Sequence, residues 1–203
     1  MLGFGESATN PERYTIDQQT DLLNQLLDEF GIGKVAIVGH GLVALVGFNF
    51  CSRWPQSVDR MMAVNCPLYF DGIHPRMRTS SPSDLTQWLG SRSEEAKLAL
   101  ADGTKADRRA IQISIESFQS ENPFSKMRQT QISCLLVHGG DDPAIPAPPV
   151  DSSINLPHMM HQVVFDSSGH FPMIDEAARF NRLLMDFLLL KSGVSPRELK
   201  IKK

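Results

Sequence analysis

The chain has 203 residues, of which 41% are hydrophobic and 21% are charged, and its formal net charge is −3. This composition is typical of a folded globular domain and excludes a disordered chain or a strongly basic protein that binds nucleic acid. No stretch approaches the roughly 20 apolar residues that a membrane-spanning helix needs. We therefore expect one domain with a substantial core and neither a nucleic-acid nor a membrane partner.

The three cysteines, Cys51, Cys66 and Cys134, all stand within apolar runs. Their odd number and their surroundings predict buried free thiols rather than a disulfide framework. Free thiols are typical of a reducing compartment, and the first residues lack the features of a secretory signal. We expect a cytoplasmic protein.

The first predicted element after the glycine-rich residues 1–7 is an amphipathic helix over residues 15–30. Thr15 and Gln18 have the spacing of a capping box, and Gly31 is placed to end the helix. One side carries an apolar stripe of Leu22, Leu23, Leu26, Leu27 and Phe30.

Residues 34–50 predict a strand, a sharp turn and a helix in succession. The apolar run at 35–38 stops at Gly39, and an apolar helical pattern continues until Pro55 forbids it. A second strand is predicted at 61–64. A strand, a helix and a strand within some thirty residues indicate a parallel sheet covered by helices.

Residues 68–126 predict short helices rather than more sheet, with helix starts at Ser81 and Ser93 and a longer helix over 104–118. The sheet resumes with strands at 132–137 and 162–165, and a last helix spans about 175–190. We expect a core of residues 1–67 and 127–203, interrupted by a helical cap at 68–126.

Three of the predicted turns follow strands of this sheet and contain Gly41, Asp142 and His170. Because the carboxyl ends of parallel strands meet at one edge of the sheet, these residues are expected to face a common crevice. The order nucleophile, acid, histidine along a chain is that of the α/β-hydrolase triad.

The motifs around these positions resemble those of the α/β-hydrolase superfamily. The resemblance is carried by VGHGL at 38–42, VHGGDDP at 137–143, SGHFP at 168–172 and LGFGES at 2–7. It implies a partial α/β-hydrolase fold, an α/β parallel sheet flanked by helices with a helical cap insert, whose amino-terminal part is lacking. It implies no cofactor and no metal.

The same resemblance implies a role for each site residue. Asp142 falls on the acid and His170 on the base, while Gly41 falls on the nucleophile and has no side chain with which to form an acyl-enzyme. Leu42 would supply the backbone N–H of half the oxyanion hole; the other half belongs to a loop after a strand that this chain lacks.

Two further expectations concern the elbow. Val43 stands where the resembled family has a small residue that lets the helix approach the sheet. Without a preceding partner strand, Val35 to Val38 would form an exposed apolar edge, through which the chain could associate with itself.

Several other polar residues have a simpler explanation. We interpret His40 as a packing residue beside the turn and His138 as a strand-end residue satisfied by backbone. The H-x-x-H of His158 and His161 contains no glutamate, which disfavours a metal site. The substitute nucleophiles considered, none of which stands on the elbow, are Ser167, Ser168 and Cys66.

Three functions follow as hypotheses. The first is a catalytically impaired hydrolase-lineage protein, a pseudoenzyme or truncated hydrolase, whose pocket binds a small apolar or ester-like molecule. The second is an active enzyme, either a hydrolase or one in which Asp142 and His170 act as a general-base dyad on a small ester-like or carbonyl substrate. The third is a non-enzymatic interaction protein that uses its sheet edge.

Overall fold

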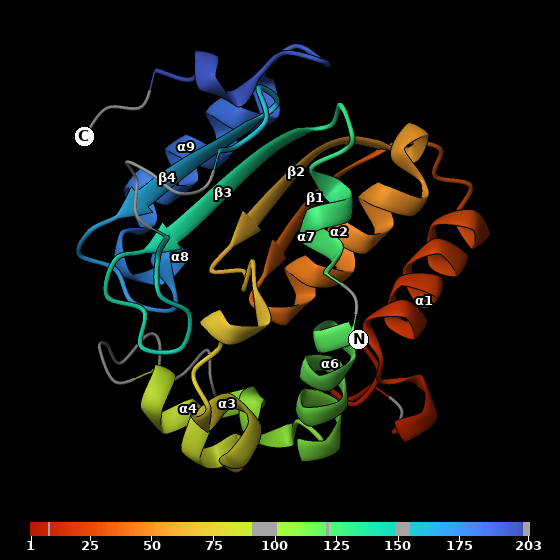
Figure 1. The fold of residues 1–203 in the computed structure, drawn as a ribbon, viewed down its shortest axis with the longest axis vertical. Coiled ribbons are helices and arrows are strands. Elements are labelled where there is room, and N and C mark those ends of the chain that lie inside the picture. Colours follow the sequence, from red (N-terminus) through yellow and green to blue (C-terminus); the bar gives the residue numbers. More distant parts are fainter. Residues whose placement is uncertain (8, 91–100, 121, 149–154, 201–203) are drawn as a thin grey trace.

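The computed structural model describes residues 1–7, 9–90, 101–120, 122–148 and 155–200. Its centre is a four-stranded parallel sheet whose strands lie in chain order. In Figure 1 all four arrows point toward the same end of the molecule. The strands are β1 (Val35–His40), β2 (Val58–Val64), β3 (Ser133–Gly139) and β4 (Met160–Phe165). The predicted α/β class is confirmed.

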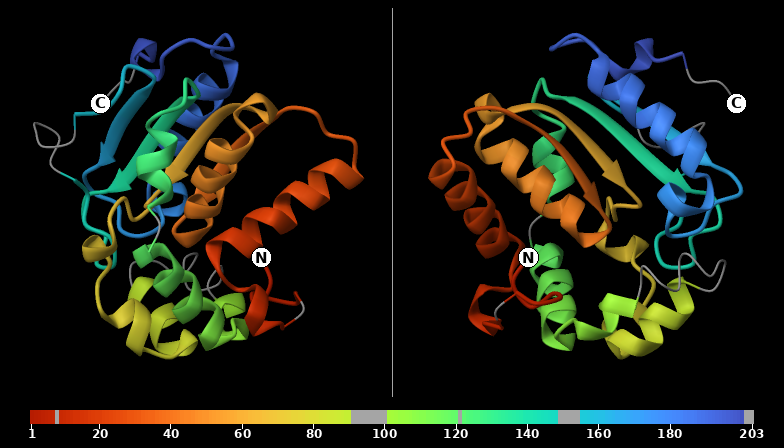
Figure 2. Two further views of the ribbon diagram at one scale, coloured as in Figure 1. Left: turned by 45° about the vertical axis from the view of Figure 1, so that its right-hand side comes forward. Right: turned by 180° about the vertical axis from the view of Figure 1, so that it is seen from behind.

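Helices lie on both faces of the sheet and beyond its carboxyl end (Figures 1 and 2). One face carries α1 (Ile16–Glu29), α2 (Leu42–Arg53) and α7 (Pro123–Met127). The other carries α9 (Ala177–Leu189), which follows α8 (Pro172–Asp175). Toward the arrow tips lie α3 (Arg76–Thr79), α4 (Pro82–Leu89) and α6 (Arg108–Ser120). The single-turn 3-10 helices are η1 (Pro11–Arg13), η2 (Pro55–Ser57), η3 (Phe70–Gly72), η4 (Ala101–Lys105) and η5 (Pro196–Glu198).

Two hydrophobic cores sandwich the sheet. Along β2, Met61 and Ala63 face the core shared with α1, α2 and α7, while Met62 and Val64 face the core shared with α9. All four side chains are buried. A strand covered on both faces reads as a continuous apolar run, which is why this segment was recognisable in the sequence.

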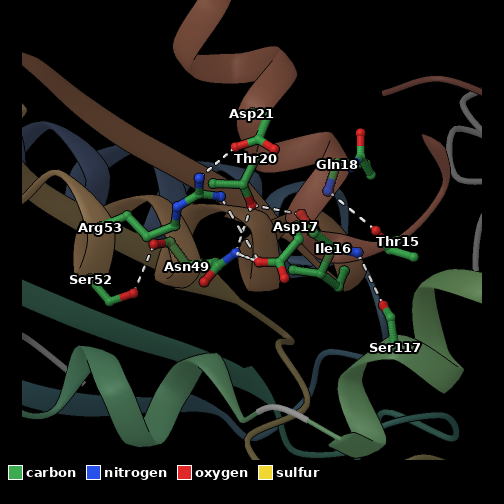
Figure 3. Close-up of polar contacts among 10 residues, drawn as sticks. All are labelled: Thr15, Ile16, Asp17, Gln18, Thr20, Asp21, Asn49, Ser52, Arg53 and Ser117. Carbon is green, nitrogen blue, oxygen red and sulfur yellow. Dashed lines mark hydrogen bonds and ion pairs between the residues drawn. The ribbon is translucent and has the colours of Figure 1, made fainter.

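Helix α1 is held against α2 by polar contacts (Figure 3). The buried Asn49 amide donates to Asp17 Oδ1 at 2.7 Å and to Thr20 Oγ1 at 3.1 Å. Arg53 forms an ion pair with Asp21 at 2.6 Å. These contacts fix α2, the helix that follows the elbow, from the side opposite the sheet.

The predicted helix ends are largely confirmed. The Thr15 hydroxyl accepts a hydrogen bond from the Gln18 N–H, and Gly31 has a φ of 64°. Ser81 and Asp84 form a complete capping box at the start of α4. The helix start predicted at Ser93 lies outside the described residues.

The predicted start of the second strand is wrong. Strand β2 begins at Val58 rather than Met61, because Arg60 is buried within it: its guanidinium donates to the carbonyl oxygens of Phe187 and Leu190 at the end of α9. At this strand the tertiary contacts outweigh the local pattern. The predicted last helix agrees with α9 to within two residues; α9 begins after Glu176, whose backbone is non-helical.

Strand β1 pairs only with β2 among the described strands, and Ala36 and Val38 on it are exposed. The expected apolar edge is therefore present in this part of the chain, whereas association through it stays a prediction. The three cysteines are buried and free, as expected. None of the described helices is long and apolar enough to cross a membrane.

Candidate active site

Gly41 forms the sharp turn between β1 and α2. Its φ of 56° and ψ of −129° lie in a region that L side chains rarely adopt, and its N–H donates to the carbonyl of Val64 at 2.9 Å. The close approach of helix to sheet depends on Gly39, where an added Cβ would lie 2.7 Å from the Ala44 Cα. Val43 is 47% exposed and borders the cavity beside the elbow; that it replaces a small residue of the resembled family stays a prediction.

The acid and histidine predicted from the sequence are in contact. His170 Nδ1 donates to Asp142 Oδ2 at 2.8 Å, and the N–H of Ala144 donates to the other carboxylate oxygen at 2.8 Å. Both side chains are buried. An acid that accepts from Nδ1 fixes the tautomer and leaves Nε2 as the reactive nitrogen.

Nε2 of His170 faces the elbow. A Cβ built on Gly41 would lie 3.8 Å from this nitrogen, with no other described atom among its neighbours within 4 Å. Leu42 is the first residue of α2, so its N–H has no acceptor one turn earlier in the helix. The structure thus brings Gly41, Leu42, Asp142 and His170 together; the roles that the resemblance implies for them stay predictions.

Asn65 ties the two functional loops together and was missed in the sequence. Its Oδ1 accepts from the Gly139 N–H at 2.7 Å, and its Nδ2 donates to the Gly169 carbonyl at 3.0 Å. It is fully buried and, among the described residues other than glycine, it alone has a positive φ, 43°. An asparagine directly after a buried strand was a usable signal, because asparagine tolerates this conformation better than most residues.

The same two loops are in close backbone contact. The Asp141 N–H donates to the Ser168 carbonyl at 2.9 Å. A Cβ added at Gly139 would overlap the carbonyl oxygen of Gly169 and lie 2.7 Å from that of Ser168. The separation of Asp142 from His170 is therefore set by backbone packing as well as by the Asn65 amide.

Two further histidines lie near the site: His138 is fully buried, whereas His40 is only partly buried. His40 Nε2 donates to the backbone oxygen of His170 at 2.8 Å. Both ring nitrogens of His138 are buried without a hydrogen-bond partner among the described residues, so the expectation that backbone satisfies this ring is wrong. Burial lowers the pKa of each histidine to about 4.

These two histidines should make the fold sensitive to mild acid. In the unfolded chain the two histidines are protonated below about pH 6.5, whereas in the folded chain they are protonated only near pH 4. The free energy of unfolding therefore falls as the pH is lowered from 6.5 to 4. The loss is on the order of 3 kcal/mol per histidine at the lower limit. Urea unfolding at pH 7.5, 6 and 5 should show it, and His138→Leu should flatten the slope. An unfolding free energy that stays constant between pH 7.5 and 5 would contradict this.

An apolar cavity of about 210 Å³ opens beside the elbow and His170. One wall of the cavity is formed by the elbow, and the opposite wall includes residues of α3 and α4. These helices lie within the predicted cap, whose boundaries stay a prediction. The described lining residues include no acid, lysine or arginine. They are Met1, Phe4, His40, Gly41, Leu42, Val43, Met77, Pro82, Leu85, Thr86, Leu89, Gly103, Ala106, Ile111 and His170.

None of the three residues considered as substitute nucleophiles, Ser167, Ser168 and Cys66, lies on the turn that contains Gly41. The Ser168 hydroxyl donates to Glu176 Oε1 at 2.8 Å. Burial raises the pKa of the Cys66 thiol well above its usual value, which disfavours the reactive thiolate. Ser167 is exposed and is not among the residues that line the cavity.

A parallel sheet with helices on both faces, a sharp turn at its carboxyl edge and a histidine–aspartate pair beside that turn define the architecture of this α/β protein. The family model described as alpha/beta hydrolase fold matches residues 1–123, more than half of the chain. The chain therefore belongs to the α/β-hydrolase family.

Similar proteins include both sequence relatives and solved structures. A protein of Enterobacter cloacae, provisionally named as the carbamate hydrolase RutD, is 27% identical over 89% of this chain and 75% of its own length. A serine-to-glycine mutant of the N-acyl homoserine lactonase AidH, complexed with N-hexanoyl homoserine lactone, has a TM-score of 0.78 at 22% identity, over 93% of this chain and 77% of that one. A meta-cleavage product hydrolase of Pseudomonas fluorescens, solved as a serine-to-alanine mutant complexed with acetates, has a TM-score of 0.65 at 23% identity, over the same shares.

Proposed function

We propose that this protein is a catalytically impaired member of the hydrolase family that binds a small, neutral acyl compound, such as an ester or lactone, and releases it intact. The observation that carries the proposal is Gly41, which faces His170 Nε2 from the nucleophile turn and offers no oxygen. Substituting the nucleophile of a serine hydrolase typically leaves only the residual catalysis of binding and the oxyanion hole.

The character of the cavity supports this ligand class. Its walls are mostly apolar side chains, and its polar groups are the histidines, Thr86 and the backbone of the elbow. Such a site favours an apolar body with one or two hydrogen-bonding atoms. The two solved relatives with a replaced serine were both complexed with small molecules, which is consistent with binding without turnover.

A second candidate is an enzyme that uses the pair of Asp142 and His170 as a general base without a nucleophile. The observation that favours it is the intact bond of 2.8 Å between the two side chains. A general base needs a substrate proton within hydrogen-bond reach of Nε2, and the cavity gives access to that nitrogen. For either candidate, the buried free thiols support a reducing compartment such as the cytoplasm.

One experiment tests both candidates. N-hexanoyl homoserine lactone and a short-chain aryl ester are titrated into the native protein by calorimetry, and the recovered ligand is analysed by mass spectrometry. We expect saturable binding and intact ligand. Ala106→Phe, which fills the cavity, should abolish binding, whereas Ala178→Phe on the exposed face of α9 should not.

Two outcomes would change the proposed function. Conversion of either ligand, if it is lost in Asp142→Asn, would favour the second candidate over the first. Absence of binding to the native protein, or binding that Ala106→Phe leaves unchanged, would contradict the proposal that this cavity holds an acyl compound.

A further inference from the structure

The short segment ahead of η1 forms part of the wall of the apolar cavity. Met1 and Phe4 line the cavity, and both side chains pack against the larger hydrophobic core. The amino terminus lies beside α6 (Figures 1 and 2). The segment therefore borders the cavity between the core helices and the helices at the arrow tips.

Hydrogen bonds to α1 fix the first part of this segment. The Leu2 N–H donates to Gln19 Oε1 at 2.9 Å, and Gln19 Nε2 donates to the Leu2 carbonyl at 3.0 Å. Gln19 is 2% exposed. Moving Leu2 away would leave a buried amide without partners, which is costly, so Leu2 stays in place.

The next residues are held as well. The Gly3 carbonyl accepts from the Asp107 N–H at 2.7 Å, just ahead of α6, and a Cβ added at Gly3 would lie 2.7 Å from the ring of Tyr14. The Phe4 carbonyl accepts from the Ser7 N–H at 3.2 Å. Because the backbone is held on both sides of Phe4, its ring is a fixed part of the cavity wall.

The size of the cavity limits the ligand. Its volume is about 210 Å³. A dry apolar cavity of about 150 Å³ holds benzene, which corresponds to roughly 25 Å³ for each non-hydrogen atom. By this measure the cavity holds about eight such atoms, the size of a six-carbon acyl group with its two ester oxygens.

We propose that Phe4 limits the chain length of the ligand, so that the cavity selects acyl groups of about six carbons. The carbonyl end of the ligand lies beside the elbow, its chain runs toward Phe4, and its alcohol part extends through the opening of the cavity. This inference rests on the proposed function and adds to it a chain length and the residue that determines it.

The test is a series of methyl esters, from butanoate to decanoate, titrated into the native protein by calorimetry. Each methylene that enters the apolar cavity should tighten binding about fourfold, and the increase should stop near hexanoate. A longer chain must displace the Phe4 ring or remain in water. Octanoate and decanoate esters should therefore bind no more tightly than the hexanoate ester.

Three variants locate the limit. Phe4→Ala removes a ring the size of benzene, so the increase should continue to about decanoate, whose ester should bind at least roughly tenfold more tightly than to the native protein. Phe4→Trp narrows the space and should weaken the hexanoate ester roughly tenfold, while the butanoate ester stays within about twofold. Phe30→Ala removes a ring that is 70% exposed and outside the cavity lining, and it should leave the series unchanged.

The outcomes separate this inference from the proposed function. Affinity that rises through decanoate in the native protein, or a limit that neither Phe4 variant shifts, overturns the inference and leaves the acyl cavity standing. Failure of every ester to bind the native protein overturns both. Because the two variants should shift the limit in opposite directions, Phe4→Trp decides the matter even if Phe4→Ala does not fold.

Discussion

Replacing Gly41 by serine should give the protein an ester-hydrolysing activity that we expect the native chain to lack. The Cβ of residue 41 lies 3.8 Å from His170 Nε2, so a hydroxyl one bond further can reach hydrogen-bond distance. Asp142 already holds the imidazole in the tautomer that accepts the serine proton. The variant would assemble nucleophile, base and acid in one step.

The expected gain follows from two opposing effects. Loss of a triad nucleophile costs about 10⁶ in kcat in a well-formed enzyme, and loss of one oxyanion-hole donor costs about 10²–10³. With Leu42 as the donor that the elbow supplies, Gly41→Ser should hydrolyse a short-chain aryl ester roughly a thousandfold faster than the native protein. The release of the aryl alcohol measures this rate.

Gly41→Ala is the matched control for this variant. Both substitutions place an L side chain at a φ of 56°, so both should destabilise the fold by about 1–3 kcal/mol in urea unfolding. Only serine adds an oxygen. Equal ester hydrolysis by the two variants, or by Gly41→Ser and Gly41→Ser combined with His170→Ala, would show that the elbow does not face the base as described.

Replacing Gly139 by alanine should be the most destabilising single methyl addition considered. Its Cβ would overlap the Gly169 carbonyl oxygen, and neither backbone segment can move without loosening the Asn65 bonds to both loops. Overpacking and the loss of buried hydrogen bonds together should cost about 3–5 kcal/mol. Urea unfolding measures this cost.

The control for this prediction is Gly33→Ala. Gly33 has no described atom within 4 Å of an added Cβ and has no positive φ, so the same change should leave stability within about 0.5 kcal/mol. If Gly139→Ala folds, its methyl should also separate His170 from Asp142 and change the imidazole NMR signals. Stability close to native for Gly139→Ala would mean that the two loops are not packed as described.

Much of the fold could be predicted because local patterns and tertiary structure agree. Strand β2 is apolar on both faces and therefore appears in the sequence as a continuous apolar run, whereas α1 has one apolar stripe that repeats with the helical period. These two patterns identify the elements. Arg60 shows where this fails: a buried arginine looks like a loop residue until the carbonyl groups at the end of α9 are seen to hold it.

The site was predictable to the extent that it lies on strand ends. Asp142 and His170 follow strands and carry recognisable motifs, so their placement near Gly41 was expected. Asn65 was not found, because its function depends on two loops that are distant in the sequence and meet only in the fold. The unsatisfied ring of His138 was hidden for the same reason.

The most direct test of the absent nucleophile is the intact mass of the native protein after incubation with a fluorophosphonate probe, which labels activated serines. Because a glycine occupies the position that His170 would activate, we predict that the mass remains unchanged. A covalent adduct on the native protein, at Ser167, Ser168 or any other side chain, would contradict this account.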